Sequence, residues 1–232
     1  MILNINLGVF GGPLRNGDLL AVCNVVEHLR KQIPNLKFHM KQNSISSEDY
    51  VRKMYDFLLQ NTDFFSLEPG NEDLKWNKIN LWDYRDISGD VATIKNKEKI
   101  EKKIVICPLF DAPYNVYRNW PIEFFYNLIQ SYNDYDNYEK IICINKPLNQ
   151  EFVGWKYSTD FAENLRHIQT AEYFIGAETG TSIFASLLDP APPNLIYYYS
   201  GRGLLHTTPF HIFNGKGQMK SYWLDFEGST WT

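Results

Sequence analysis

Apolar and polar residues alternate along the first part of the chain in a way that predicts strands and helices in turn. Residues 1–10 form an apolar, β-rich run that ends in a Gly-Gly-Pro turn, which is typical of a buried strand entering a loop. Apolar residues then recur at helical spacing from 19 to 29, and residues 36–40 form a second strand-like run. This order predicts a βαβ unit with a right-handed crossover and a parallel sheet. Further predicted elements are a helix over 48–59 and strands over 63–67 and 79–84.

The pattern is interrupted by a charged stretch and then restarts. Residues 88–103, which include KNKEKIEKK, have little apolar periodicity and predict a solvated helix or an interdomain linker. Beyond them, strands are predicted over 104–109, 140–144, 173–176 and 195–199, and helices over 121–132, 161–169 and 181–188. This alternation in both halves predicts an α/β protein with two Rossmann-like, doubly wound domains facing a cleft, one over 1–98 and one over 99–215.

Composition is compatible with this arrangement and narrows the class of partner. The 232 residues are 44% hydrophobic and 22% charged, as in globular proteins, and the length fits two domains of about a hundred residues each. Aromatic residues make up 16% of the chain, which indicates large aromatic cores or rings that line a base- or sugar-binding cleft. A net charge of −4 argues against a protein held to nucleic acid by a broad phosphate footprint.

Three cysteines, Cys23, Cys107 and Cys143, lie far apart within apolar runs and form no CxxC pair. This spacing predicts buried free thiols in a reducing compartment and no metal site. No apolar run approaches the roughly 18 residues of a membrane span, and the N-terminus does not resemble a signal peptide. We therefore expect a cytoplasmic protein without a transmembrane segment.

Residues 171–188, AEYFIGAETGTSIFASLL, hold the most informative candidate site. A buried strand ends near residue 176 and a short polar turn leads into an apolar helix, and ligands of open α/β sheets bind at such strand ends. The helix start offers backbone N–H groups to a diphosphate, and Thr179, Thr181 and Ser182 add hydroxyl donors. Gly180 lets a phosphate approach the backbone, and Glu178 accepts from sugar hydroxyls. The alternative is an ordinary capped helix.

A second candidate lies in residues 106–125, ICPLFDAPYNVYRNWPIEFF, where Arg118 precedes Trp120-Pro121 at a helix start. A planar guanidinium there can clamp phosphate oxygens. The alternative is a surface arginine beside a tryptophan that staples the helix. Arg202, in Gly201-Arg202-Gly203 after the last predicted strand, is a further candidate for contact with the nucleotide.

Together these segments carry a resemblance to the heptosyltransferase family of GT-B glycosyltransferases. The resemblance covers residues 104–188: an apolar strand, a basic residue before Trp-Pro, a helix, and a turn of the form A-(D/E)-x-x-I-(G/A)-x-(D/E)-(S/T)-G before another helix. A weaker match in the first half is Gly17-Asp18-Leu19-Leu20, where the family has Gly-Asp after its first strand. Where the family usually has a histidine after the turn glycine, this chain has Ile183.

The resemblance implies an inverting, metal-independent hexosyl- or heptosyltransferase whose donor is a nucleotide-sugar, with no cofactor. It implies that Asp18 is the general base, although a carboxylate there also suits a helix cap. Arg118, Glu178, Thr179 and Gly180 would hold the donor. The acceptor-side loop would comprise Gly12, Arg15, Asn16 and Gly17, and the tail 216–232 would pack back on the first domain.

Three alternatives remain open from the sequence. One is a sugar-nucleotide epimerase or hydrolase on the same fold. The second is a catalytically degenerate GT-B module that binds a sugar or nucleotide. The third is a viral enzyme that glycosylates modified bases in DNA, so the acceptor classes are a glycan, a lipid-linked sugar and a modified nucleobase.

Overall fold

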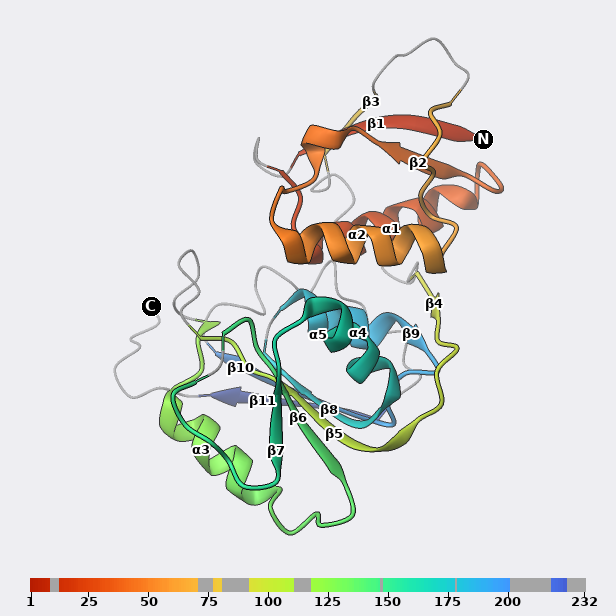
Figure 1. Cartoon of the computed structure of the whole chain (residues 1–232). Helices are drawn as coiled ribbons and strands as arrows, with labels where there is room; N and C mark the ends of the chain where they lie inside the picture. Colours follow the sequence, from red (N-terminus) through yellow and green to blue (C-terminus); the bar gives the residue numbers. More distant parts are fainter. Residues whose placement is uncertain are drawn as a thin grey trace. The chain divides into compact units, whose positions relative to one another are not determined.

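The chain folds into two compact units, each built on a parallel β-sheet (Figure 1). The structure, a computed structural model, describes residues 1–8, 13–70, 77–80, 92–110, 118–146, 148–177, 179–200 and 218–224. Among the described residues, those up to Lys95 belong to the first unit and those from Asn96 on belong to the second. The mixed α/β class predicted from the sequence is confirmed.

The first unit contains a three-stranded sheet in the order β2-β1-β3, with both pairings parallel. Its strands are β1 (Ile2–Gly8), β2 (Lys37–Met40) and β3 (Asn77–Asn80). A single parallel bridge joins Phe65 to Phe38 on the outer side of β2. The strand predicted over 63–67 is therefore reduced to one bridging residue, and the predicted βαβ unit is confirmed.

Two α-helices and a 3₁₀ turn connect these strands: α1 (Asn16–Arg30), η1 (Gln42–Ser44) and α2 (Asp49–Asn61). The apolar stripe of α1 is buried because Leu19, Val22 and Val26 are fully enclosed. α2 buries Met54 and Leu58 in the same way. The last strand of this unit is the two-residue β4 (Ile94–Lys95).

The second unit has a six-stranded, all-parallel sheet in the order β11-β10-β8-β5-β6-β7. Its strands are β5 (Glu101–Cys107), β6 (Glu139–Cys143), β7 (Trp155–Ser158), β8 (Ala171–Gly176), β10 (Asn194–Ser200) and β11 (Gln218–Leu224). Numbered within this sheet alone, the order reads 6-5-4-1-2-3, which is the strand order of a doubly wound Rossmann fold. The order reverses between β5 and β8, so these two strands flank the switch point.

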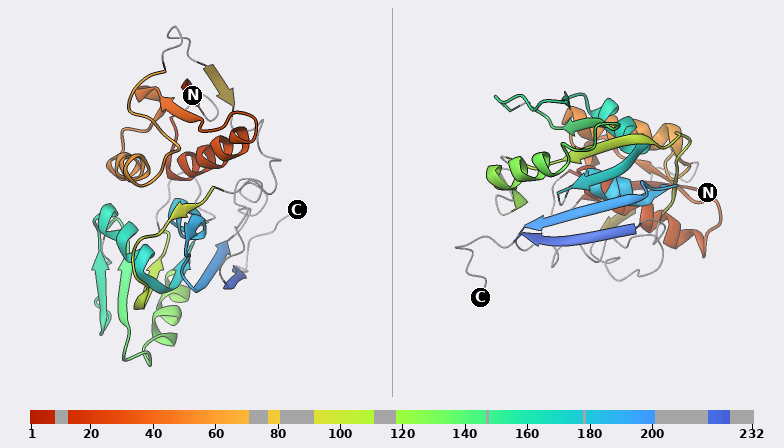
Figure 2. Two further views of the ribbon diagram at one scale, coloured as in Figure 1. Left: turned by 90° about the vertical axis from the view of Figure 1, so that its right-hand side faces the viewer. Right: turned by 90° about the horizontal axis from the view of Figure 1, so that it is seen from below.

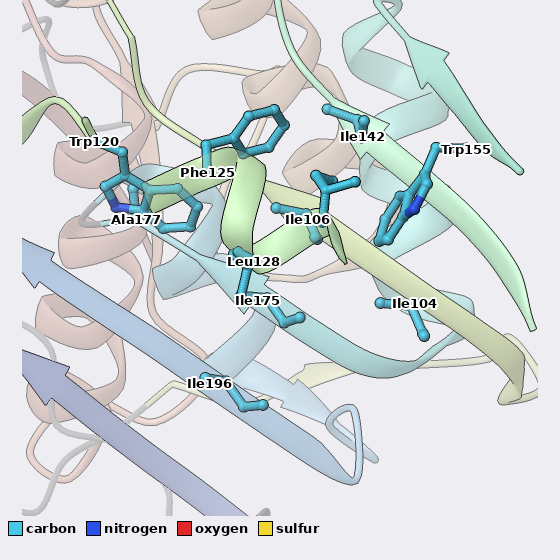
Figure 3. Packing of buried hydrophobic residues seen from close by; sticks show 11 residues of the cluster. Ile104, Ile106, Trp120, Phe125, Leu128, Ile142, Trp155, Ile175, Ala177 and Ile196 are labelled. Carbon is cyan, nitrogen blue, oxygen red and sulfur yellow. The ribbon is translucent and has the colours of Figure 1, made fainter. Parts of the chain in front are cut away.

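Helices cover both faces of this sheet: α3 (Ile122–Ser131) on one face and α4 (Phe161–Thr170) with α5 (Gly180–Leu187) on the other. Strand side chains alternate between faces, so Ile104 and Ile106 point toward α3 while Phe174 and Tyr197 point toward α5. Figure 3 shows the core under α3, where Phe125 and Leu128 pack over the strand isoleucines. A two-residue strand, β9 (Leu188–Asp189), follows α5.

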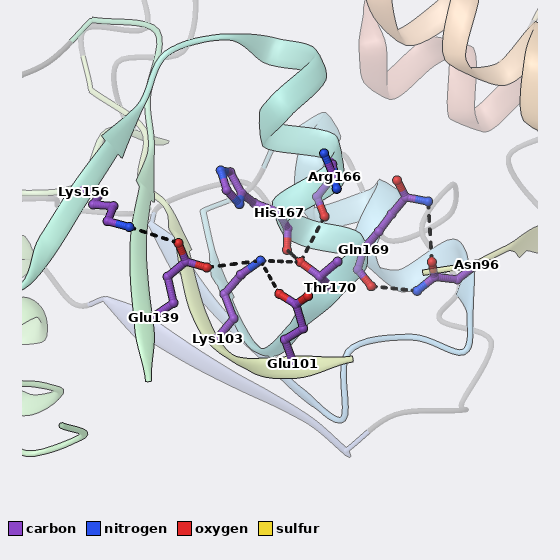
Figure 4. Close-up of polar contacts among 9 residues, drawn as sticks. All are labelled: Asn96, Glu101, Lys103, Glu139, Lys156, Arg166, His167, Gln169 and Thr170. Carbon is purple, nitrogen blue, oxygen red and sulfur yellow. Dashed lines mark hydrogen bonds and ion pairs between the residues drawn. The ribbon is translucent and has the colours of Figure 1, made fainter. Parts of the chain in front are cut away.

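The start of β5 differs from the prediction for the charged stretch 88–103. β5 begins at Glu101, inside that stretch, and the Lys103 side chain is only 7% exposed. Its Nζ lies 2.7 Å from a Glu101 carboxylate oxygen and 3.4 Å from one of Glu139, and it donates to the Thr170 hydroxyl at 2.8 Å (Figure 4). Since all three partners satisfy the ammonium, a lysine is accommodated in a strand whose sequence does not look apolar.

Two strands of the six-stranded sheet were not predicted. β7 is a short edge strand without an apolar run, and β11 lies within the tail that was expected to pack on the first domain. Gln218–Leu224 pair with β10 along its whole length, from Asn194 to Ser200, and are therefore part of the second unit's sheet. Figure 2 shows β10 and β11 side by side. Within the part of the chain that the structure describes, no helix is long and apolar enough to span a bilayer.

Candidate functional site

Each of the two segments that carry the family resemblance contains the carboxyl end of a strand, and these two strands are neighbours in the second unit's sheet. Cys107, the last residue of β5, is paired in register with Gly176, the last residue of β8. The pairing continues for one more step, because the Ala177 N–H donates to the Cys107 carbonyl at 3.1 Å. Both loops therefore leave the sheet at the point where the strand order reverses, which is where open α/β sheets bind ligands.

The segment after β5 returns to the strand end through Trp120. Its backbone N–H donates to the Leu109 carbonyl at 2.8 Å, and its indole Nε1 donates to the Tyr198 carbonyl at 3.3 Å. The ring packs edge-on against Phe124, at 5.3 Å between centroids, and is 3% exposed. Trp120 therefore anchors the segment near the carboxyl end of β5, in agreement with the stapling alternative. Arg118 lies two residues before this anchor. Arg118 is half-buried, with its Nε shielded from solvent.

The turn after β8 leads into α5 with Thr179 as the N-cap residue. The Thr179 side chain does not cap the helix backbone; its hydroxyl lies 2.7 Å from the hydroxyl of Thr181. The helical ladder begins with the N–H groups of Ser182 and Ile183, which both donate to the Thr179 carbonyl. The N–H groups of Gly180 and Thr181 precede this ladder and carry the partial positive charge of the helix start.

Ser182 does not take the position expected of a diphosphate donor. Its hydroxyl donates to the Ala177 carbonyl, its backbone carbonyl accepts from the Tyr197 hydroxyl at 3.1 Å, and the residue is 6% exposed. Ser182 is thus engaged inside the fold. Among the described residues of this turn, Thr179, Gly180 and Thr181 are half-buried and remain near the surface.

The connection from β5 to α3 contains no glycine between Pro108 and Pro121. A Rossmann dinucleotide site needs a glycine-rich turn directly after its first strand, so this unit does not carry that fingerprint. The glycines of the switch point, Gly176 and Gly180, instead flank the turn after β8. Of the predicted site residues, Gly12, Glu178 and Arg202 lie outside the described residues.

In the first unit, Asp18 lies in the first turn of α1, three residues after the N-cap position of Arg15. One oxygen of its carboxylate accepts from the Arg15 backbone N–H at 2.9 Å. This contact is the half of a capping box in which the side chain of the third helical residue accepts from the backbone of the N-cap residue. Burial raises the pKa of Asp18 above its ordinary value, and the hydrogen bond and charge of Arg15 reduce this effect without cancelling it.

A carboxylate that sequence reasoning missed lies beside this helix start. A parallel bridge between Leu14 and Ile45 brings Glu48 next to Arg15, with 3.9 Å between the Arg15 Nε and a Glu48 oxygen. The same oxygen accepts from the Tyr50 hydroxyl at 2.8 Å and from the Ser46 hydroxyl at 3.0 Å. The available signal was a glutamate at the first position of the helix predicted over 48–59.

Asn16, a predicted acceptor-side residue, is 7% exposed, and its Oδ1 accepts no hydrogen bond from the described residues. A buried amide oxygen without a donor is costly, so this atom is suited to a ligand hydroxyl. Gly17 is half-buried beside it, and the exposed Arg15 completes the described part of the predicted loop.

Among the residues that the structure describes, no three His, Cys, Asp or Glu side chains are grouped closely enough to hold a metal ion. The cysteines are free and buried, as predicted. No family model matches the chain, and no curated protein or solved structure matches it.

Proposed function

We propose that the chain is a heptosyltransferase-like glycosyltransferase of the GT-B type, in which the second unit binds a nucleotide-sugar and the first unit binds the acceptor. The observation that carries the proposal is the register of Cys107 with Gly176. It brings the Arg118 segment and the Thr179–Thr181 turn to the same switch point of a doubly wound sheet.

The chemistry of the switch point suits a diphosphate. Gly180 and Thr181 supply backbone N–H groups at a helix start, and the arginine supplies a permanent positive charge. A leaving nucleoside diphosphate develops negative charge in the transition state, and donors fixed in advance stabilise that charge without a metal. We assign Arg118, Thr179, Gly180 and Thr181 to the donor and leave Ser182 out.

In this proposal Asp18 accepts the proton of an acceptor hydroxyl. The hydroxyl oxygen then bonds to the anomeric carbon while the bond to the diphosphate breaks on the opposite face, which inverts the configuration. A raised pKa suits the carboxylate to this role, because a base works best when its pKa lies near the working pH. The Asn16 amide oxygen is available to a second acceptor hydroxyl.

The donor site is tested by thermal unfolding of the full chain with millimolar UDP, GDP, ADP and CMP. A nucleotide that binds only the folded state raises the unfolding temperature. We expect at least one to do so, and we expect Arg118→Ala and Thr181→Val to reduce the shift. Arg166→Ala, a matched change at an exposed position on α4, leaves the shift unchanged. If no nucleotide stabilises the wild-type chain, the donor site is refuted.

A second candidate is a GT-B module that binds a sugar or nucleotide but has lost catalysis. The hydrogen bond from the Arg15 N–H favours it, since it gives the Asp18 carboxylate a structural role in α1. The two candidates share the donor site and differ in turnover. A module binds nucleotide yet forms no glycoside with any of the three acceptor classes.

A further inference from the structure

Four tyrosine rings form a cluster near the amino-terminal ends of strands in the second unit's sheet. The switch point lies at the carboxyl-terminal ends of these strands. Tyr132, Tyr135 and Tyr138 come from the end of α3 and the turn before β6, a turn that can be followed in Figure 1, and Tyr173 comes from the start of β8. All four are partly exposed. The candidate donor site does not use this cluster.

The rings pack directly on one another around Tyr135. Its centroid lies 5.3 Å from that of Tyr132, 5.4 Å from that of Tyr138 and 5.8 Å from that of Tyr173. At these separations aromatic rings touch, so no guest fits between them and the cluster is not an aromatic cage. A cation can approach only from outside, over the exposed parts of rings that are already held in place.

Three acidic residues are direct sequence neighbours of these tyrosines. Asp134 and Asp136 are exposed in the same turn, and Glu172 accepts from the Tyr138 hydroxyl at 2.8 Å. None of the three forms an ion pair within the described part of the chain. The hydrogen bond to Glu172, followed by burial and the negative charge of that residue, raises the pKa of Tyr138 to about 12.

Two lysines on strands β6 and β7 do not neutralise this charge. Lys140 is 6% exposed, and its Nζ donates a hydrogen bond to the Asn133 carbonyl at 2.8 Å. Lys156 pairs with Glu139, which belongs to the Lys103 network. The surface therefore combines preformed aromatic area with uncompensated negative charge.

We propose that Tyr132, Tyr135, Tyr138 and Tyr173, together with Asp134, Asp136 and Glu172, form a docking surface for an arginine- and lysine-rich segment of a partner protein. Charge complementarity selects this occupant over an acidic segment or nucleic acid. Guanidinium groups pair with carboxylates and stack on aromatic faces. Tyrosine supplies contact area at a low entropic cost, and here the rings are already ordered by one another.

The test uses the full chain and two fluorescent peptides of equal length, one alternating arginine with glycine and one alternating glutamate with glycine. Fluorescence anisotropy at low salt is expected to show binding of the arginine peptide alone. Asp134→Asn/Asp136→Asn is expected to weaken binding about tenfold, since two charge pairs are removed at low ionic strength. Tyr135→Leu, which removes the central ring, is expected to weaken it as well.

Glu68→Gln/Glu151→Gln is the matched control, because it removes the same charge from exposed positions elsewhere. Equal losses in the two double variants would mean attraction to the acidic chain as a whole and would overturn the proposal. Full affinity in Tyr135→Leu would also overturn it, as would no binding of the arginine peptide to the wild-type chain. Tyr132→Leu replaces Tyr135→Leu if thermal unfolding shows that the latter does not fold. Nucleotide-induced stabilisation, which reports the donor site, is expected to be unchanged in all variants.

Discussion

Ser182, in the first turn of α5, lies directly over the backbone of Gly176, the last residue of β8. A Cβ atom at position 176 would collide with the Ser182 hydroxyl and come within 2.7 and 2.8 Å of two Phe174 ring carbons. Folded proteins do not show contacts this close, so the absence of a side chain allows α5 to start where it does. The helix start that we assign to the diphosphate therefore depends on this glycine.

Gly176→Ala is expected to lower the free energy of unfolding by about 1–3 kcal/mol, the usual cost of overpacking a core. Urea denaturation measures the change. Ser182→Ala alone is expected to cost about 1 kcal/mol through its lost hydrogen bond. Because the alanine at 182 removes the colliding oxygen, the double variant should lose less than the sum of the two single losses. Strict additivity would contradict the packing described here.

Lys103 and Lys156 both contact Glu139, yet they should differ in their contribution to stability. The Lys103 side chain is 7% exposed and that of Lys156 is 73% exposed. Lys103→Met leaves Glu101, Glu139 and Thr170 without their shared donor and is expected to lower the free energy of unfolding by about 1–3 kcal/mol. Lys156→Met should change it by no more than about 0.5 kcal/mol. Similar losses in parallel urea titrations would contradict a buried network centred on Lys103.

The same network predicts a pH dependence. Burial works against ionisation of Glu139, but the charge of Lys103 and the hydrogen bonds from Lys156 and Lys103 outweigh it and lower the pKa of Glu139. A carboxylate with a lowered pKa in the folded state adds stability that is present above its unfolded pKa and is lost as pH falls through the folded value. The free energy of unfolding should therefore fall on acidification below about pH 4.5. Urea titrations across this range should show a smaller fall in Lys103→Met.

The local pattern of apolar and polar residues was sufficient to predict most helices and the central strands. Ile104 to Ile106 is a continuous apolar run and α3 has a clear apolar stripe, so both reveal their burial without knowledge of their partners. Lys103 does not, because a charged residue is accepted in a strand only when distant partners satisfy it. Here Glu139 and Thr170 do so, and neither is near it in the sequence.

Some parts of the candidate site could be predicted from local sequence and others could not. The turn before α5 was recognised from its composition, because strand-turn-helix boundaries have local signals. The inward direction of the Ser182 hydroxyl depends on the Ala177 carbonyl across the turn, and spacing alone does not reveal it. Glu48 was missed because only the bridge between Leu14 and Ile45 brings it beside Arg15.

The three cysteines should be poorly reactive in the folded chain. Burial raises the pKa of the Cys23 thiol, and burial together with a hydrogen bond to Cys107 raises that of Cys143. Since the thiolate is the reactive form, a thiol reagent at mildly alkaline pH should modify the native chain much more slowly than the chain in urea. Three thiols should react after unfolding. One fast-reacting thiol in the native chain would contradict its burial.

Asp18→Asn separates a structural role from a catalytic one. The pKa of Asp18 is raised in the folded state, so the stability linked to its proton is fully present below its unfolded pKa and is lost as pH rises through the folded value. At neutral pH asparagine removes the cost of a buried charge and still accepts from the Arg15 N–H. The free energy of unfolding at pH 7 should therefore stay within about 0.5 kcal/mol of the wild type or increase.

If Asp18 is the general base, the same variant loses turnover by about 10²–10⁴-fold while nucleotide-induced stabilisation is kept. Glu48→Gln serves as the matched control, because it neutralises the carboxylate that lies beside Arg15 at the same helix start. Loss of turnover in Glu48→Gln but not in Asp18→Asn would move the base to Glu48. Full turnover in Asp18→Asn would leave Asp18 as a helix cap alone, because asparagine keeps the hydrogen bond from the Arg15 N–H and removes only the base.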